Sequence, residues 1–386
     1  MKDKKNKKIL FIANTLTHHK IFNYAIIQNM AKKGFDVKIV SMIDSRKNLQ
    51  RFTDFEIINW KLDRGSTNIT KEFFAFINIY KIIKKEKPDL IYNFTIKANI
   101  YSSIAGKILK VKKIINTVTG LGYTYTDKNF STLPIRTLIK ILWTISLNFS
   151  DLIMFMNFTD KKILGKYVYK AKKFVIPGHG IDENFYSKNA ADKKQVAMIK
   201  KQLEISPRDV IIVTVGRLIK HKGINEFAKA AVSLMKKHRE LKFVIVGMED
   251  RQNPTSIPDL EIENFRNNGI KVLKNRSDVR EILCLSDIFV LMSHMEAVPQ
   301  VIIEAMSMKL PIITTDTAGC NERVEVNKNG YLVAVGDHKA LAKRIVKLAQ
   351  NKEKRISFGK YSRKIVEKKY SREKMTEKIA KIIAAT

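Results

Sequence analysis

Short apolar runs alternate along the chain with longer stretches in which apolar residues recur at helical spacing. Gly34 follows the first such stretch, where glycine commonly ends a helix, and Pro88 disfavours helix just after the second. In the first half, the predicted strands span residues 8–13, 36–41, 55–60, 90–94, 113–118, 152–156 and 174–176. The predicted helices there span residues 21–33, 71–85 and 99–110. Strands separated by helices indicate a parallel sheet covered on both faces.

The same alternation restarts after residues 187–194, a polar, charge-rich interruption that predicts the approach to a domain boundary. The predicted strands then span residues 210–215, 243–246, 270–273, 288–292 and 312–315, and the predicted helices residues 224–237, 279–285, 301–308, 338–350 and 373–385. The fold class is therefore α/β, with two doubly wound Rossmann-like domains over residues 1–188 and 189–370. Residues 371–386 form a terminal helix that could pack back on the first domain. Ligands are expected at the carboxyl ends of the strands, facing a central cleft.

The charge balance is strongly basic, with 72 Lys and Arg against 37 Asp and Glu, a net charge of +35. Such a charge indicates an anionic partner: nucleic acid, anionic lipid or a phosphate-bearing substrate. Lysine is spread along almost every surface segment, so a lysine-rich coding background explains the pattern equally well. With only 2 cysteines, no disulfide framework is indicated, and residues 9–13 are too short for a secretory signal. These features predict a cytoplasmic location.

Residues 133–149 form the longest apolar stretch, which falls short of the roughly 18 residues that span a bilayer. Arg136 and Lys140 lie four residues apart and therefore share one helical face. One interpretation is an interfacial helix at a membrane surface. The other, which we favour slightly, is a core helix.

Two glutamates bound the most informative run of the chain, residues 296–304 (EAVPQVIIE). Pro299 suits a loop or a first helical turn, which puts Glu296 on the loop and Glu304 inside the helix. Free N–H groups of the helix start lie between them, and such groups suit a phosphate. Because carboxylates accept hydrogen bonds from hydroxyls, the run predicts a nucleotide-sugar pocket, with phosphates at the helix start and hydroxyls on the two glutamates.

A basic loop follows the predicted strand 210–215. Gly216 would let the chain turn tightly, and Arg217 and Lys222 are cations at the strand's end, where a diphosphate could sit. In a chain this rich in lysine, chance placement explains such a loop as well as function does. The two-glutamate run downstream makes the pattern much more specific.

Together these motifs resemble the retaining glycosyltransferases of family 4, which have the GT-B fold, and the resemblance covers essentially the whole chain. In the first half, residues 93–101 (NFTIKANIY) and 116–123 (NTVTGLGY) resemble a narrower subgroup. Its members extend undecaprenyl-diphosphate-linked sugars, and they include bacterial N-glycan, capsule and O-antigen transferases.

The resemblance implies roles for the motif residues. Arg217 and Lys222 would bind the donor diphosphate, Glu296 would hold the donor sugar, and Glu304 would accept from the ribose; the first three are the expected catalytic residues. The rest of the expected donor-binding set comprises Gly216 and the segment whose amides would meet phosphate oxygens, Val298, Pro299, Gln300 and Val301. The family commonly has glycine where this chain has Ala297, which could tighten the space beside the donor sugar.

Acceptor-binding candidates come from the first domain. Many family members have a histidine where this chain has Thr119, so no catalytic histidine is carried over. Thr119, Gly120 and Gly122 are expected to contact donor or acceptor. His18 and His19, on the first strand-to-helix loop, either meet the acceptor diphosphate or form a surface pair. Lys97 follows strand 90–94, and its place and charge also suit the acceptor.

The sequence thus predicts a hexosyltransferase acting at the inner face of a bacterial cytoplasmic membrane. It would move a UDP-linked hexose or N-acetylhexosamine to an undecaprenyl-diphosphate-linked saccharide, in the synthesis of a surface polysaccharide or a glycoprotein glycan. No cofactor or metal is expected, because the cations neutralise the diphosphate and no zinc or calcium spacing is visible. Peripheral contact with anionic membrane is expected, and a nucleic-acid partner is not.

Two alternatives stay open. A nucleotide-sugar 2-epimerase of the same fold would need no lipid acceptor. A basic nucleic-acid-binding protein would use the charge, although aromatic residues are not interleaved with basic ones as in a base-stacking platform.

Overall fold

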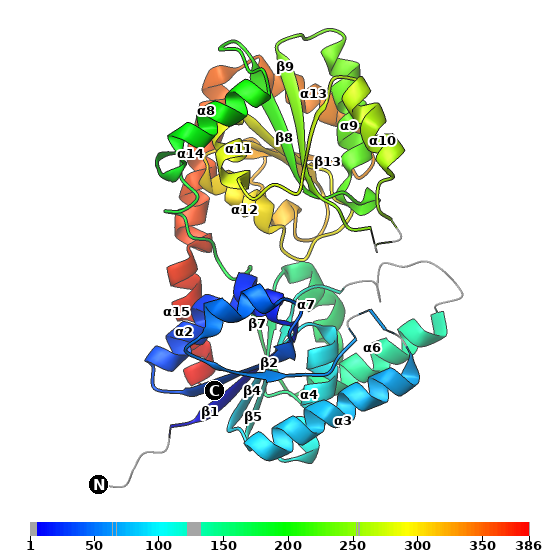
Figure 1. The fold of residues 1–386 in the computed structure, drawn as a ribbon, viewed down its shortest axis with the longest axis vertical. Coiled ribbons are helices and arrows are strands. Elements are labelled where there is room, and N and C mark those ends of the chain that lie inside the picture. Colours follow the sequence, from blue (N-terminus) through cyan, green and yellow to red (C-terminus); the bar gives the residue numbers. More distant parts are fainter. Residues whose placement is uncertain are drawn as a thin grey trace. The chain divides into compact units, whose positions relative to one another are not determined.

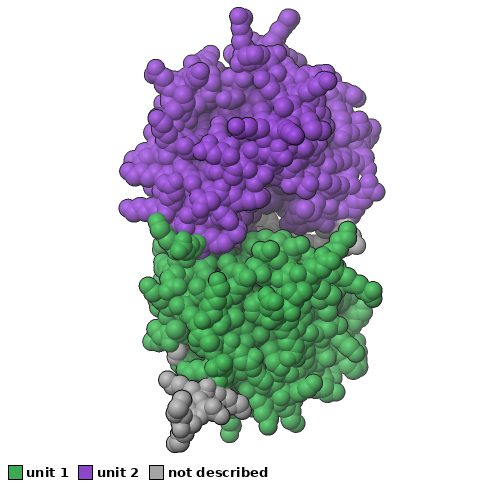
Figure 2. Space-filling view, turned by 60° about the vertical axis from the view of Figure 1, so that its left-hand side comes forward, with its two compact units in different colours: residues 1–179, 373–386 green, residues 180–372 purple. Residues whose placement is uncertain are grey.

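The computed structural model describes residues 6–63, 65–66, 68–121, 133–251, 253 and 255–385. The chain forms two compact units, residues 1–179 with 373–386 and residues 180–372 (Figure 2). The second unit begins ahead of the polar segment 187–194 because Ile181 is already tied into it. The Ile181 N–H donates to the Tyr370 carbonyl at 2.8 Å, and its own carbonyl accepts from the Arg372 N–H at 2.8 Å.

The first unit is built on a parallel sheet with strand order β3-β2-β1-β4-β5-β6-β7. Its strands are β1 (Lys8–Thr15), β2 (Asp36–Met42), β3 (Glu56–Asn59), β4 (Leu90–Phe94), β5 (Lys113–Val118), β6 (Leu152–Phe155) and β7 (Lys172–Val175). Successive side chains of a strand point to opposite faces. Accordingly, Ile9 and Phe11 of β1 belong to one core cluster, and Leu10 and Ile12 belong to another.

Helices cover both faces of this sheet (Figure 1). The described helical segments are α1 (Leu16–His18), η1 (His19–Asn23), α2 (Tyr24–Lys32), η2 (Arg46–Phe52), α3 (Ile69–Glu86), α4 (Ile96–Ile108), α6 (Leu133–Asn148), α7 (Phe158–Leu164), η4 (Gly165–Tyr167) and α15 (Arg372–Ala384). Apolar residues of α2 and α15 share the cluster of Ile9 and Phe11. Apolar residues of α3 and α4 belong to the cluster of Leu10 and Ile12. Residues of α6 and α7 form a further cluster with Ile100 of α4.

The second unit repeats the plan with strand order β10-β9-β8-β11-β12-β13, again all parallel. Its strands are β8 (Val210–Arg217), β9 (Leu241–Met248), β10 (Lys271–Lys274), β11 (Ile288–Leu291), β12 (Ile312–Thr315) and β13 (Gly330–Val333). The predicted α/β class with two parallel sheets is confirmed.

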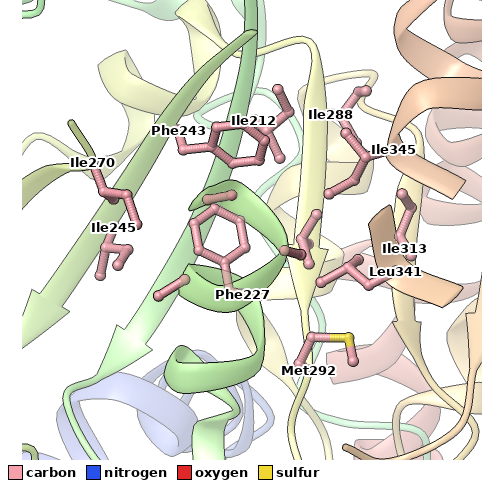
Figure 3. Packing of buried hydrophobic residues seen from close by; sticks show 14 of the residues in the cluster. Ile212, Phe227, Phe243, Ile245, Ile270, Ile288, Met292, Ile313, Leu341 and Ile345 are labelled. Carbon is pink, nitrogen blue, oxygen red and sulfur yellow. The ribbon is translucent and has the colours of Figure 1, made fainter. Parts of the chain in front are cut away.

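Two apolar layers flank the second sheet. Its helical segments are η5 (Lys188–Ala190), α8 (Lys193–Gln202), η6 (Lys220–Lys222), α9 (Ile224–Met235), α10 (Asp259–Asn267), α11 (Val279–Leu285), α12 (Gln300–Ser307), η7 (Asn321–Arg323), α13 (His338–Ala349), α14 (Lys352–Ile365) and η8 (Val366–Tyr370). On one face, Phe227 of α9 and Leu341 of α13 pack against Phe243 and Ile313 of the sheet (Figure 3). On the other face, α8, α11, α12 and the end of α14 form the second layer.

Helix α6 is both a core helix and an apolar surface. Trp143 and Leu147 are fully buried against the neighbouring core, whereas Leu138, Ile141 and Ile145 are 50%, 52% and 42% exposed. Within the described residues, no helix combines the length and apolar character needed to cross a membrane.

Candidate active site

Lys222 and Glu296 form the centre of the candidate site. Lys222 ends the short turn η6, which follows β8, and Gly223 then opens α9 with a φ of +67°. A Cβ at Gly223 would overlap the Met292 carbonyl oxygen, so only glycine lets this turn lie against the end of β11. The turn brings Lys222 Nζ into a hydrogen-bonded ion pair with Glu296 Oε1. Their side chains are only 18% and 13% exposed, so the pair is largely shielded from water.

The segment that follows β12 packs against the Glu296 loop at Gly319. Gly319 has a φ of +77°, and a Cβ there would overlap the Glu296 carbonyl oxygen. The loop then runs through Pro299 into α12, whose N-terminal end carries no side-chain cap. The Ile302 N–H donates to the Pro299 carbonyl at 3.0 Å. The first N–H groups of a helix have no intrahelical acceptor, so α12 presents such amides at its start, four residues after Glu296 in the chain.

The predicted amide donors need one correction. Pro299 has no N–H, so it cannot donate to a phosphate. Val298 precedes it on the loop, and Gln300 and Val301 open α12. All three are half-buried, and only these three of the four predicted residues have an amide N–H that could donate.

Glu304 lies one turn into α12 and is half-buried. Burial raises the pKa of its carboxyl to about 7, and a hydrogen bond with the Tyr186 side chain acts in the opposite direction. The carboxyl therefore exchanges its proton near neutral pH, and its charge depends on its immediate partners.

Arg217 is placed at the carboxyl end of β8, where its Nη1 donates to Asp250 Oδ2 at 2.7 Å. Its side chain is 46% exposed, so the guanidinium can also meet a ligand. Gly216 differs from expectation. It lies inside β8 opposite Gly247 of β9, and the tight turn is made by Gly223 instead.

The acceptor candidates lie in the first unit, where His19 and Lys97 are already committed to internal contacts. His19 is fully buried; its Nδ1 contacts Asn23 Nδ2 at 3.0 Å, and its ring meets Phe94 edge-on. Burial lowers the pKa of His19 to about 3, so the imidazole is neutral. Lys97 Nζ donates to the Asp63 and Ser66 carbonyls at 2.9 and 2.8 Å and to Glu72 Oε1 at 2.8 Å. All three N–H donors of Lys97 are used. His19 or Lys97 could therefore contact the acceptor substrate only if these internal hydrogen bonds broke.

The remaining acceptor candidates are more accessible. His18 is half-buried and packs against Phe22. Thr119 and Gly120 are half-buried just after β5, and Gly120 has a φ of +126°. Gly122 lies outside the described residues.

Backbone strain marks the same edge of the first sheet. Thr95, between β4 and α4, has a φ of +74°, and its hydroxyl donates to Asn14 Oδ1 at 2.6 Å. Strain of roughly 1–3 kcal/mol at a β-branched residue persists where surrounding contacts enforce it, often at functional sites.

Two family profiles match this chain. A profile described as "Glycosyl transferases group 1" matches residues 195–365, and one described as "Glycosyl transferase 4-like" matches residues 8–157. The chain belongs to the glycosyltransferases. The first profile covers Lys222, Glu296 and Glu304, so the candidate site of this glycosyltransferase lies within the matched region.

Individual glycosyltransferases are similar to this chain over most of its length. The enzyme is 27% identical, over 88% of both chains, to N,N'-diacetylbacillosaminyl-diphospho-undecaprenol alpha-1,3-N-acetylgalactosaminyltransferase of Campylobacter jejuni. It is 28% identical to UDP-Gal:alpha-D-GlcNAc-diphosphoundecaprenol alpha-1,3-galactosyltransferase of Escherichia coli, over 78% of this chain and 76% of that one. Among solved structures, Anabaena HepE in complex with UDP superposes with a TM-score of 0.79 at 17% identity, over 98% of this chain and 100% of that chain. This last likeness shows a shared fold.

Sequence reasoning missed several residues around the site of this glycosyltransferase. His294 Nε2 lies 3.0 Å from Glu226 Oε1, and the His294 N–H donates to the His221 carbonyl at 2.9 Å. These contacts join the loop before Glu296 to the turn that carries Lys222 and to the first turn of α9, where Glu226 lies. No spacing rule links residues so far apart in the chain, so the sequence offers no signal for them.

Proposed function

We propose that this glycosyltransferase transfers a hexose or N-acetylhexosamine from a UDP-sugar to an undecaprenyl-diphosphate-linked saccharide, with retention of anomeric configuration. The observation that carries the proposal is the shielded Lys222–Glu296 pair, whose glutamate lies on the loop that leads into the uncapped start of α12. A cation, free amides and a carboxylate at one sheet edge suit a sugar diphosphate, which needs positive charge at the phosphates and acceptors at the hydroxyls.

Each donor residue has a defined part in the proposed reaction. Lys222, Arg217 and the α12 amides stabilise the charge that builds on the departing UDP. Glu296 accepts from the donor sugar, and Glu304 accepts from the ribose. As the sugar–phosphate bond breaks, the acceptor hydroxyl attacks from the same face, and its proton passes to a departing phosphate oxygen. No cofactor or metal takes part in this scheme.

The acceptor is proposed from the relatives. Both relatives described above have names that specify a diphospho-undecaprenol substrate and an α-1,3 linkage. Common UDP-hexoses are α-linked, so an α product from such a donor means retention. For such a lipid-linked acceptor, we propose that the enzyme works at the cytoplasmic face of the bacterial inner membrane.

The test uses the purified full-length chain with a panel of UDP-, GDP- and dTDP-sugars and a synthetic polyprenyl-diphosphate-linked N-acetylhexosamine. We expect UDP release that depends on the acceptor, and a product with an α anomeric signal by NMR. A β product would contradict retention. Epimerisation of a UDP-sugar in the absence of acceptor would favour the epimerase, and tight, salt-sensitive oligonucleotide binding without transfer would favour a nucleic-acid role.

Membrane contact is proposed through an apolar surface on the first unit. It comprises the exposed residues of α6 described above and a second group at the start of α3, Ile69, Phe73 and Phe74, which are 81%, 58% and 66% exposed. Both helices contact α4, so the two groups lie on the same face of the sheet. A net charge of +35 would draw this surface to anionic lipid.

We expect Phe73→Ser with Ile141→Ser to weaken binding to vesicles that contain phosphatidylglycerol by about 30-fold or more, because each apolar group buried in the interface contributes roughly 1–2 kcal/mol and the two together contribute roughly 2–4 kcal/mol. Co-sedimentation at low and high salt measures this. Ile356→Ser is the matched control, since Ile356 is 49% exposed on α14 of the second unit. Equal binding of all variants, or equal binding to neutral vesicles at every salt concentration, would contradict the proposed surface.

A further inference from the structure

His294 connects the loop that carries Glu296 to the segment that carries Lys222. Its backbone N–H donates to the His221 carbonyl at 2.9 Å, and its Nε2 lies 3.0 Å from Glu226 Oε1. His221 directly precedes Lys222 in η6, and Glu226 lies in the first turn of α9. A single residue, two positions before Glu296, is thus attached to the chain on both sides of Lys222.

The backbone at this point is also attached to the sheet. The Ser293 carbonyl accepts from Thr315 Oγ1 of β12, and Ser293 Oγ donates to the His221 carbonyl at 3.1 Å. The His221 and His294 rings meet edge-on, with 6.0 Å between their centres. Because the backbone is already ordered, the contact between the His294 ring and α9 costs little further conformational entropy.

The partner of Glu226 is chemically specific. The chain has 72 Lys and Arg against 37 Asp and Glu, yet no lysine or arginine forms an ion pair with Glu226 in the part of the chain that the structure describes. A carboxylate only accepts, so His294 Nε2 carries a proton and donates. A ring N–H has a fixed place on a short side chain, whereas a lysine ammonium moves on a flexible stem. The histidine therefore specifies the position of the loop more narrowly than a lysine would.

We propose that His294 is a positioning residue, which by donating to Glu226 keeps Glu296 aligned with Lys222 while the donor is bound. The inference rests on the proposed function, because it assumes that Lys222 binds the diphosphate and Glu296 binds the sugar. In the structure these two side chains hold each other in an ion pair. A bound donor competes for both of them, so their pair then fixes the loop less firmly. The contact between His294 and Glu226 uses neither group and persists.

The consequence is a difference between the complete donor and UDP alone. UDP has no sugar for Glu296 to hold, so its binding depends less on where that carboxylate lies. Loss of the contact between His294 and Glu226 should therefore impair binding and transfer of the UDP-sugar and leave UDP affinity nearly unchanged. Stability should change little, because the two side chains are 37% and 17% exposed and such pairs contribute little to folding.

The experiment compares His294→Ala with Glu226→Ala in the full chain. It measures kcat and KM for the UDP-sugar that is transferred fastest in the panel above, and UDP affinity by calorimetry. We expect either variant to lower kcat/KM by about 10- to 30-fold, since misplacing a substrate contact by about 1 Å can cost up to roughly 10²-fold. UDP affinity should stay within about threefold of wild type.

Two further variants serve as controls. Glu226→Gln should keep kcat/KM within about threefold of wild type, because the amide oxygen still accepts from His294 Nε2. His238→Ala is the matched control for loss of a histidine–glutamate pair. His238 Nδ1 lies 3.3 Å from Glu240 Oε1 on the loop between α9 and β9, at the opposite edge of the same sheet. Its loss should leave donor kinetics unchanged.

A double-mutant cycle tests whether the two side chains act together. The double variant His294→Ala with Glu226→Ala should be no worse than either single variant. Multiplied losses, wild-type kinetics in both single variants, or an equal fall in UDP affinity would overturn the inference and leave the proposed function intact. If Glu296→Ala leaves kcat and donor KM unchanged, the assignment of the donor site fails instead. Should His294→Ala fold poorly by thermal denaturation, the comparison of Glu226→Ala with Glu226→Gln decides, because both keep His294.

Discussion

Lys222→Met should lower kcat by about 10²–10³, the usual cost of removing one fixed donor to a developing negative charge. Methionine supplies an unbranched apolar stem of similar length without the ammonium group, so the fold should persist. The loss has two causes: the leaving diphosphate loses a cation, and Glu296 is left without the partner that now orients it. Steady-state kinetics with saturating UDP-sugar, together with UDP affinity, measures the effect.

The matched control for Lys222→Met is Lys220→Met. Lys220 belongs to the same short turn but is exposed, so it should retain near wild-type kcat. If both variants lose activity equally, net charge and not position is responsible. If Lys222→Met retains full activity, the pair does not form the donor site.

The second large effect is expected from Gly319→Ala. A methyl group there would overlap the Glu296 carbonyl oxygen, and the residue must also adopt a φ of +77°. The backbone strain costs roughly 1–2 kcal/mol, and the overlap should add about 1–3 kcal/mol. Because the Glu296 loop must shift, donor KM should rise along with the loss of stability. Urea unfolding and donor kinetics give the two readouts.

Gly336→Ala isolates the strain from the overlap. Gly336 has a φ of +80°, yet a Cβ there would meet nothing within 4 Å. Gly336→Ala should therefore show only the strain and leave donor KM unchanged. Similar unfolding free energies and similar KM for the two variants would contradict the assigned contact between Gly319 and the Glu296 loop.

Strong apolar periodicity explains which elements could be predicted from the sequence. β4, β5, α11 and β12 have the predicted bounds, because each is a compact apolar run with polar or turn residues at its ends. α8 was missed because it is rich in lysine and only Ile199 on it is buried. β13 was missed because it begins at Gly330, a residue that disfavours strands. Here the glycine is needed, since a Cβ would overlap the Ile312 carbonyl oxygen of the neighbouring strand.

The same limit applies to the candidate site: positions within one element could be predicted, and contacts between distant segments could not. The loop position of Glu296 and the helical position of Glu304 followed from Pro299 and the apolar run after it. The direct pairing of Lys222 with Glu296 could not be predicted, because it depends on two close approaches between distant segments. Gly223 lies against Met292, and Gly319 lies against Glu296. Burial of His19 was also missed, since nothing in a histidine pair reveals which ring faces the core.

The attachment of α15 to the first unit has a consequence for synthesis. Met375, Ile379 and Ile383 belong to the same apolar cluster as Ile9 and Phe11, although the whole second unit is synthesised between them. The intervening residues 180–372 form a compact unit with two apolar layers of their own. During translation, therefore, the second unit can fold before the first is complete, because the first needs α15, which is synthesised after residues 180–372. A fragment that stops at residue 179 would lack this helix and expose the apolar surface that it covers.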